Sequence, residues 1–323
     1  AVSDYAGTTD TNAITIGRNS SNINGAAADL VVEQENSAVT LVYVDGTQGW
    51  KATDTSSLSD IELEPAYVTA TGGTISCSGD YRIHTFTGPG TFCVSALGNP
   101  LGSSSADYLV VAGGGGGGGG CSGSGGGSGA GGGGYRTNFP GSGTPVTVQG
   151  YPIVIGGGGA AGTSVSPGTI HGDGVNGGNS SGLGIISAGG GGGNHGPCTS
   201  LDGQPGGSGG GASGGVPNPR TGGSGNTPAT PVSQGNNGGN TGTCGSSTIY
   251  DSAGGGGAGG VGQNSQPGPR AGGVGSANSI SGSAVTYAAG GRGGNYNGSP
   301  EPNASEPANS GNGGVGKSGG PAG

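Results

Sequence analysis

Over the first 112 positions, short runs of β-branched and aromatic residues alternate with polar, turn-forming residues. The runs Ile14–Ile16, Asp29–Glu33 and Val39–Val44 are separated by the turn-rich stretches 18–25 and 34–37, a pattern typical of short β-strands. In the third run both alternating sets of side chains are largely apolar. This predicts a strand that is buried on both sides, by neighbouring chains. Residues 1–52 are therefore expected to form a small β-module that needs oligomerisation to bury enough core.

An acidic, polar stretch, residues 53–65, is expected to be a linker, and a second small β-module is expected over residues 66–112. Gly88-Pro89-Gly90 predicts a hairpin turn, because glycine supplies positive φ and proline fixes its own φ. The predicted strands are Tyr67–Thr69, Thr74–Cys77, Tyr81–Thr87 and Thr91–Ser95. Cys77 and Cys93 fall within this module, which leaves two alternatives: a disulfide or two buried thiols.

From Asp107 onward a short apolar stretch repeatedly runs into polyglycine. These stretches begin at Tyr108, Tyr151, Gly184, Ile249 and Ala284. The recurrence indicates one architectural unit that is used repeatedly, with loops rich in Asn, Pro, Ser and Thr between the copies.

The glycine content supports a boundary at about residue 112, because all but 12 of the 90 glycines lie beyond it. Such a composition ordinarily indicates a disordered linker. The alternative is an ordered domain, residues 113–323, of packed polyglycine-II helices, whose N–H and C=O groups must pair with neighbouring helices. The apolar stretches favour the ordered alternative. The predicted fold class is thus mostly β and irregular, with small β-modules followed by a domain of polyglycine-II helices.

Charge excludes several classes of partner. Residues 1–112 carry the whole net charge of −9, and the remaining residues are formally neutral. A basic surface for nucleic acid is therefore not expected, and neither is binding to anionic membranes or membrane insertion. His195 and Cys198 are too few ligands for a zinc site, and the carboxylates beyond residue 112 are scattered singly. We expect no metal, no cofactor and no enzymatic activity.

Two passages resemble bacteriophage tail-fibre proteins, especially those of aquatic phages. The first comprises Asn24-Gly25, residues 29–32 and residues 39–50; the second comprises residues 67–73 and 84–92, leading into residues 107–112 and polyglycine. Residues 280–288 fit the same glycine-rich type. The resemblance implies a homotrimeric β-rich shaft, other virion tail proteins upstream, and a glycine-rich adhesin tip that displays loops to the host cell. The implied location is the virion tail fibre, outside the cell.

Three loops carry side chains suited to recognition, because aromatics and arginine dominate binding hot spots. The candidate receptor-binding residues are Tyr135, Arg136, Asn138, Phe139, Asn218, Arg220, Asn295 and Tyr296. The expected ligand is a bacterial surface glycan or an outer-membrane protein. The alternative is that Tyr135, Phe139 and Tyr296 only cover the edges of the glycine domain.

Two other functions compete with adhesion. One is an extracellular structural filament or matrix protein with no receptor. The other is an ice-binding protein, which would explain the glycine but neither residues 1–112 nor the lack of a regular threonine array.

Overall fold

The structure is a computed structural model that describes residues 1–4, 6–35, 37–54, 61–63, 65–120, 125–141, 143–163, 172–196, 201–214, 219–242, 251–265, 270–295 and 310–318. These residues form strands, turns and irregular extended chain without any helix, so none of them lies in a helix that could cross a membrane. The expected β-rich and irregular fold class is confirmed at this level.

The chain divides into two compact units that do not follow the linear boundaries expected from composition. Unit 1 comprises Ala1–Thr71, Cys93–Ala106 and Pro145–Gly150. Unit 2 comprises Gly72–Phe92, Asp107–Thr144 and Tyr151–Gly323.

The N-terminal part of unit 1 contains two small antiparallel sheets, with strand orders β1-β4-β5 and β2-β3-β6. Their strands are β1 (Val2–Ser3), β2 (Ile14–Ile16), β3 (Leu30–Val32), β4 (Ala38–Asp45), β5 (Gly49–Asp54) and β6 (Ile61–Leu63). All three runs that predict strands in this region therefore form strands. Their core is small and consists of Ile23, Leu30, Val32 and Val39.

In the single chain strand β4 is buried only near its start. Val39 is 2% exposed and belongs to the core, whereas Val42 and Val44 are 47% and 55% exposed. Tyr43 and Trp50 pair edge to face, with 5.4 Å between ring centroids, and both are also exposed. The predicted burial on both sides is not met within one chain, because none of the described residues of unit 1 covers Val42, Tyr43 or Val44.

The acidic stretch 53–65 is more than a linker. Its first residues complete β5, and β6 pairs antiparallel with β3, with Leu63 opposite Leu30 and Ile61 opposite Val32. Strand β3 is buried, so its backbone needs a hydrogen-bonding partner on both edges. That requirement decides the pairing despite the polar composition.

The next strands form a hairpin and two further small sheets. Strands β8 and β9 pair antiparallel, β7, β10 and β15 form a sheet of order β15-β10-β7, and β11 pairs with β14. Their bounds are β7 (Thr69–Thr71), β8 (Thr74–Ser78), β9 (Tyr81–Thr85), β10 (Gly90–Ala96), β11 (Ser105–Ala106), β14 (Thr144–Pro145) and β15 (Gly150–Ile153). The segment Gly88–Gly90 does separate two strands, but β9 and β10 belong to different sheets, so it connects sheets and does not close a hairpin.

Cys77 and Cys93 are both free and exposed. Cys77 lies on β8 opposite Arg82, and Cys93 lies on β10 opposite Thr71, in a different sheet. Neither alternative left open by the sequence is therefore met: the disulfide is not formed, and the thiols are not buried.

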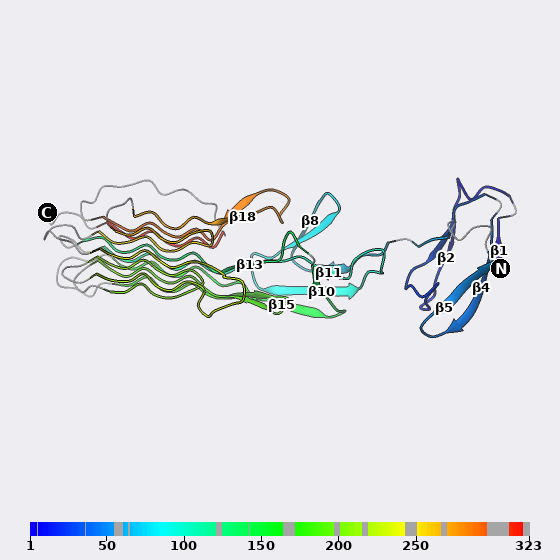
Figure 1. Ribbon diagram of the computed structural model, residues 1–323, viewed down its shortest axis with the longest axis horizontal. Helices are drawn as coiled ribbons and strands as arrows, with labels where there is room; N and C mark the ends of the chain where they lie inside the picture. Colours follow the sequence, from blue (N-terminus) through cyan, green and yellow to red (C-terminus); the bar gives the residue numbers. More distant parts are fainter. Residues whose placement is uncertain are drawn as a thin grey trace. The chain divides into compact units, whose positions relative to one another are not determined.

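Glycine-rich segments of unit 2 run back and forth side by side, as the long parallel traces of Figure 1 show. These segments, called the glycine bundle below, cover residues 112–120, 125–134, 156–163, 172–179, 188–196, 201–214, 219–226, 234–242, 251–265, 270–275, 288–295 and 310–318. The bundle is ordered by backbone hydrogen bonds between segments, so the disordered-linker alternative does not describe these residues.

The most enclosed segment is 125–134, in which every residue is buried. All of its N–H groups from Gly127 to Gly134 donate to neighbouring carbonyls at 2.7–3.1 Å, and the partner changes with every residue. Every third residue returns to the same neighbour. Residues 127, 130 and 133 donate to segment 311–317, residues 128, 131 and 134 to segment 188–194, and residues 129 and 132 to segment 253–256.

The carbonyl groups of the same segment face three other neighbours. They accept hydrogen bonds from segments 112–118, 208–211 and 291–294, again at every third residue. Segment 125–134 thus exchanges hydrogen bonds with six surrounding segments. A β-strand, with its period of two, pairs with only two neighbours, so this arrangement is not a sheet.

Short hairpins gather at one end of the bundle, called the hairpin end below. They are β12 (Leu109–Val111) with β13 (Tyr135–Thr137), β16 (Ser180–Gly182) with β17 (Ile185–Ser187), and β18 (Ser276–Asn278) with β19 (Val285–Tyr287). Four of the five apolar stretches lie here, in or beside β12, β15, β17 and β19. The stretch at 249 is different: its first two residues are outside the described residues, and Asp251–Gly254 form no strand.

Candidate functional site

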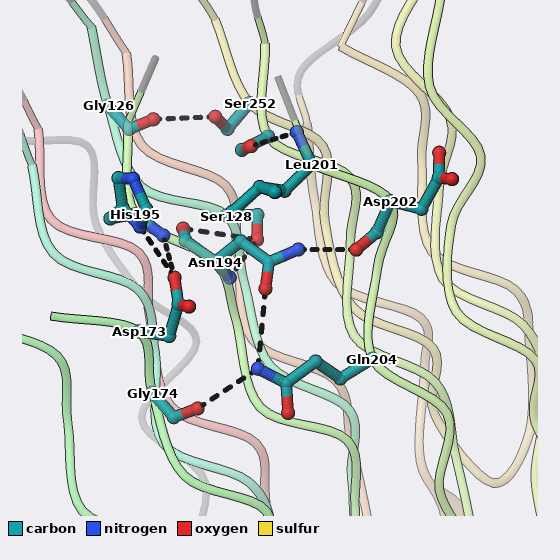
Figure 2. A network of polar contacts seen from close by, with 11 residues as sticks. Gly126, Ser128, Asp173, Gly174, Asn194, His195, Leu201, Asp202, Gln204 and Ser252 are labelled. Carbon is teal, nitrogen blue, oxygen red and sulfur yellow. Dashed lines mark hydrogen bonds and ion pairs between the residues drawn. The ribbon is translucent and has the colours of Figure 1, made fainter. Parts of the chain in front are cut away.

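A network of polar side chains lies among the glycine segments (Figure 2), and the backbone hydrogen bonds place it toward the end of the bundle opposite the hairpins. This end, called the open end below, contains residues 118–120, 194–196, 201–202 and 317–318. Backbone hydrogen bonds join its segments, such as that from Gly196 N–H to Gly119 C=O at 2.8 Å. The described charged side chains of the bundle lie at or near this end, namely Asp173, Asp202, Arg220, Asp251, Arg270, Arg292 and Lys317, whereas amide side chains occur along its whole length. The open end is therefore the candidate functional site.

Asn194 occupies the centre of this network and is 2% exposed. Its Nδ2 donates to the carbonyl of Asp202 at 2.6 Å, and its Oδ1 accepts from Gln204 Nε2 at 3.3 Å. Its backbone N–H donates to Ser128 Oγ at 2.7 Å. Burial of an amide is costly unless its groups are paired, so these bonds hold the segments in one register.

His195 and Asp173 form a partly exposed pair next to Asn194. The His195 Nδ1 lies 2.7 Å from Asp173 Oδ1, and the same oxygen accepts the His195 backbone N–H at 2.9 Å. The side chains are 14% and 41% exposed, respectively. Solvent screening keeps such pairs weak, so the contact orients the histidine more than it stabilises the fold.

Along the outer segments, Asp and Asn side chains accept backbone N–H groups, as backbone carbonyls do elsewhere in the bundle. Asp173, Asn176 and Asn179 are spaced by three, and their Oδ1 atoms accept the backbone N–H groups of His195, Gly192 and Gly189. Asn237 and Asn240 do the same for Gly225 and Gly222. Sequence reasoning missed these residues. Their signal was present, because Asx recurs at intervals of three among glycines in 173–179 and 237–240.

Four of the five basic residues beyond position 112 lie near the open end, namely Arg220, Arg270, Arg292 and Lys317. Arg270, Arg292 and Lys317 come from adjacent segments, since Gly293 N–H donates to Arg270 C=O and Gly316 N–H to Arg292 C=O. The Arg270 guanidinium is paired with Asp251, while Lys317 is exposed. Arg220 has a buried Nε without a hydrogen-bond partner among the described residues.

The structure divides the residues that the sequence proposes for receptor binding between the two ends. Tyr135–Phe139 lie at the hairpin end, whereas Arg220 and Asn295 lie at the open end and are half-buried. Asn218 and Tyr296 fall outside the described residues. The proposed set is therefore not one surface, because each polyglycine run carries the chain from one end of the bundle to the other.

The residues at the hairpin end make internal contacts. Asn138 Oδ1 accepts the Tyr108 N–H at 2.7 Å, and Arg136 donates to the Ile186 carbonyl at 3.2 Å. Phe139 packs edge to face against Tyr81, with 6.5 Å between ring centroids. The aromatic contact of Phe139 is with β9, and Tyr296 lies outside the described residues, so the alternative in which the aromatics cover the edges of the glycine domain stays a prediction.

Tyr135 is the residue at the hairpin end with a perturbed pKa. Burial raises the pKa of its phenol above 10.0; the hydrogen bond donated by Asn278 Nδ2 to the phenol oxygen, at 2.8 Å, opposes this, and Tyr287 adds to it. The protonated phenol is thus favoured in the folded state. The protonated Tyr135 phenol contributes fully to stability at pH values below its pKa in the unfolded state, which is about 10. This contribution is lost as the pH rises through the higher pKa of the folded state.

We therefore expect the free energy of unfolding to fall less steeply above about pH 10 in Tyr135→Phe than in the unaltered protein. Phenylalanine keeps the ring buried but has no proton to lose. Denaturant unfolding across this pH range measures the difference. Identical pH dependence in the two proteins would contradict the assignment.

Metal ligands do not gather in the described parts of the chain. No group of three or more His, Cys, Asp or Glu side chains is placed there to hold a metal ion. His195 is described, but Cys198 and His171 lie outside the described residues.

Comparison with known proteins gives one result. The sequence model of a family described as a glycine-rich domain matches residues 87–323. No curated protein and no solved structure gives a significant match. The matched region contains the whole glycine bundle and its hairpins, and it covers well over half of the chain. The chain belongs to this glycine-rich domain family.

Proposed function

We propose that the segments of the glycine bundle are polyglycine II helices. The supporting observation is the period of three in segment 125–134, since a polyglycine II helix has three residues per turn and no internal hydrogen bonds. Segment 113–120 repeats the pattern. Gly113, Gly116 and Gly119 donate to one antiparallel neighbour, at Gly178, Val175 and Gly172.

We further propose that the bundle is the adhesive tip of an extracellular fibre of the phage tail-fibre type. The observation that carries this proposal is the concentration of charged side chains at one end of a backbone-bonded framework. Recognition residues are commonly placed where chain turns leave a rigid scaffold. The expected ligand is a bacterial surface glycan or an outer-membrane protein that meets Arg220, Arg292, Asn295 and Lys317.

In this proposal residues 1–52 join three copies of the chain. The exposed Val42, Tyr43, Val44 and Trp50 are large apolar side chains, and the buried core cluster of the described residues in this region is small. Burial of each such side chain contributes about 1.5–3 kcal/mol to the free energy of assembly. A small unit buries too little apolar surface by itself, so this contribution favours association. Upstream contacts with other virion tail proteins complete the fibre.

The proposal predicts binding of the purified chain to the surface of its host bacterium. Fluorescently labelled protein would be applied to a panel of aquatic bacteria, and cell binding measured against concentration. The triple variant Arg220→Ala, Arg292→Ala, Lys317→Ala should bind at least about tenfold more weakly, because hot-spot side chains contribute about 2 kcal/mol or more.

The control is the double variant Arg82→Ala, Arg136→Ala, which removes cations away from the open end and should bind as the unaltered chain does. Equal binding by the folded triple variant, or equal loss in the control, contradicts the assignment of the site. Absence of binding to every bacterium, with continuous polymers in electron micrographs, would favour a structural filament.

A further inference from the structure

Four Asn–Gly steps of the described chain, one in unit 1 and three in unit 2, share one pattern of hydrogen bonds. They are Asn24–Gly25, Asn176–Gly177, Asn237–Gly238 and Asn312–Gly313. A fifth, Asn297–Gly298, lies outside the described residues. Asn–Gly is the dipeptide in which spontaneous deamidation meets the least steric resistance, because glycine has no side chain to hinder the ring closure.

The reaction needs two groups of the step to be free. The backbone nitrogen of the glycine loses its proton and attacks Cγ of the asparagine side chain. A C–N bond forms, the amide nitrogen leaves as ammonia, and a five-membered succinimide results. Water then opens the ring to aspartate or isoaspartate.

In all four steps the attacking N–H already donates to a backbone carbonyl. Gly177 donates to Gly190 at 2.9 Å, Gly238 to Gly223 at 3.0 Å, and Gly313 to Ala289 at 2.8 Å. In unit 1, Gly25 donates to Gln48 at 2.9 Å. These bonds hold the proton and direct the nitrogen away from the side chain.

In all four steps the electrophilic amide is held as well. Asn176 Oδ1 accepts the Gly192 N–H at 2.7 Å, Asn237 Oδ1 accepts that of Gly225 at 2.8 Å, and Asn312 Oδ1 accepts that of Ala289 at 2.9 Å. Asn24 Oδ1 accepts the Ala52 N–H at 3.0 Å. Asn176 and Asn237 are exposed to solvent, so burial does not shield their side chains.

We infer that these four steps are deamidation sites at which the native hydrogen bonds prevent the reaction. Isoaspartate then forms only when the local structure opens. The product matters most in the bundle. Aspartate retains an oxygen at the same place, as Asp173 already does in the ladder with Asn176. Isoaspartate adds one carbon to the backbone, which breaks the register of three residues on which the hydrogen bonds depend. This inference does not depend on the adhesive function.

The test compares deamidation in the native full chain with that in its proteolytic peptides, in mildly alkaline water enriched in oxygen-18. Mass spectrometry of each Asn–Gly peptide counts the label gained when the succinimide opens. We expect every one of the four sites to react at least about tenfold more slowly in the native chain, because reaction awaits local opening. Native rates equal to the peptide rates at Asn176 and Asn237 would overturn the inference.

A second comparison uses the variant Gly131→Ala, which places a methyl group inside the bundle. Deamidation should accelerate at Asn176, Asn237 and Asn312 and stay unchanged at Asn24, which lies in unit 1. Uniform acceleration at all four sites, or none in a demonstrably destabilised variant, would contradict the proposed mechanism.

Discussion

Replacement of Gly131 by alanine should destabilise the glycine bundle more than any other conservative change considered for this chain. A Cβ atom at this position would lie 2.0 Å from the carbonyl oxygen of Ser208 and 2.6 Å from its carbon. Both are backbone atoms of a buried neighbour, so no side-chain rotation relieves the contact. We expect a loss of about 3 kcal/mol or more and a fall in Tm of roughly 6–12 °C.

The matched control is Gly157→Ala, because a Cβ built at Gly157 meets no atom within 4 Å. This change should alter the free energy of unfolding by no more than about 0.5 kcal/mol. Thermal and denaturant unfolding of both variants give the comparison. Equal stabilities would mean that the segments are not packed as closely as described. Ala130 is fully buried next to Gly131, so the effect belongs to the position and not to alanine in general.

Replacement of Val42 and Val44 together by aspartate should change the mass of the particle in solution from three chains to one. Both side chains are about half exposed in the single chain, and the proposed assembly buries them against other copies. Two unpaired carboxylates in an apolar interface are costly, whereas they are harmless in water. Sedimentation equilibrium measures the mass directly.

The control for this experiment is the double variant Val232→Asp, Val261→Asp. These valines are 76% and 63% exposed and lie in unit 2, so the variant adds the same charge elsewhere. It should retain the mass of three chains. The proposed trimer is wrong if the unaltered protein sediments as a single chain, or if Val42→Asp, Val44→Asp leaves the mass unchanged.

Much of the N-terminal architecture could be predicted from local patterns. The runs at 14–16, 29–33 and 39–44 become β2, β3 and β4, because alternating β-branched residues favour extended chain and flanking polar residues end it. Strand β6 was missed because its neighbours are acidic. Its existence depends on β3, whose edge needs a partner, and that need appears only when the sheet is assembled.

The candidate site was less predictable. Aromatic and arginine residues in 135–139 and 218–220 have the composition of a binding surface, but composition carries no information about which end of the bundle a loop reaches. Asn138 and Arg136 turn out to bond with Tyr108 and Ile186. The Asx residues of the outer segments could have been recognised from their spacing of three, had a period of three been considered for side chains as well as for the backbone.

The sequence by itself determined that this chain has β-modules followed by a glycine-rich region in which backbone groups take the place of a hydrophobic core. It also determined the positions at which the runs of glycine begin. Only the tertiary structure decided which runs are neighbours, which end carries the charges, and which amides complete the hydrogen bonding. The reason is physical: successive glycines are identical, so one run can pair with any other. The choice of partner is left to the few Ser, Asn and Asp side chains whose contacts exist only after the segments have come together.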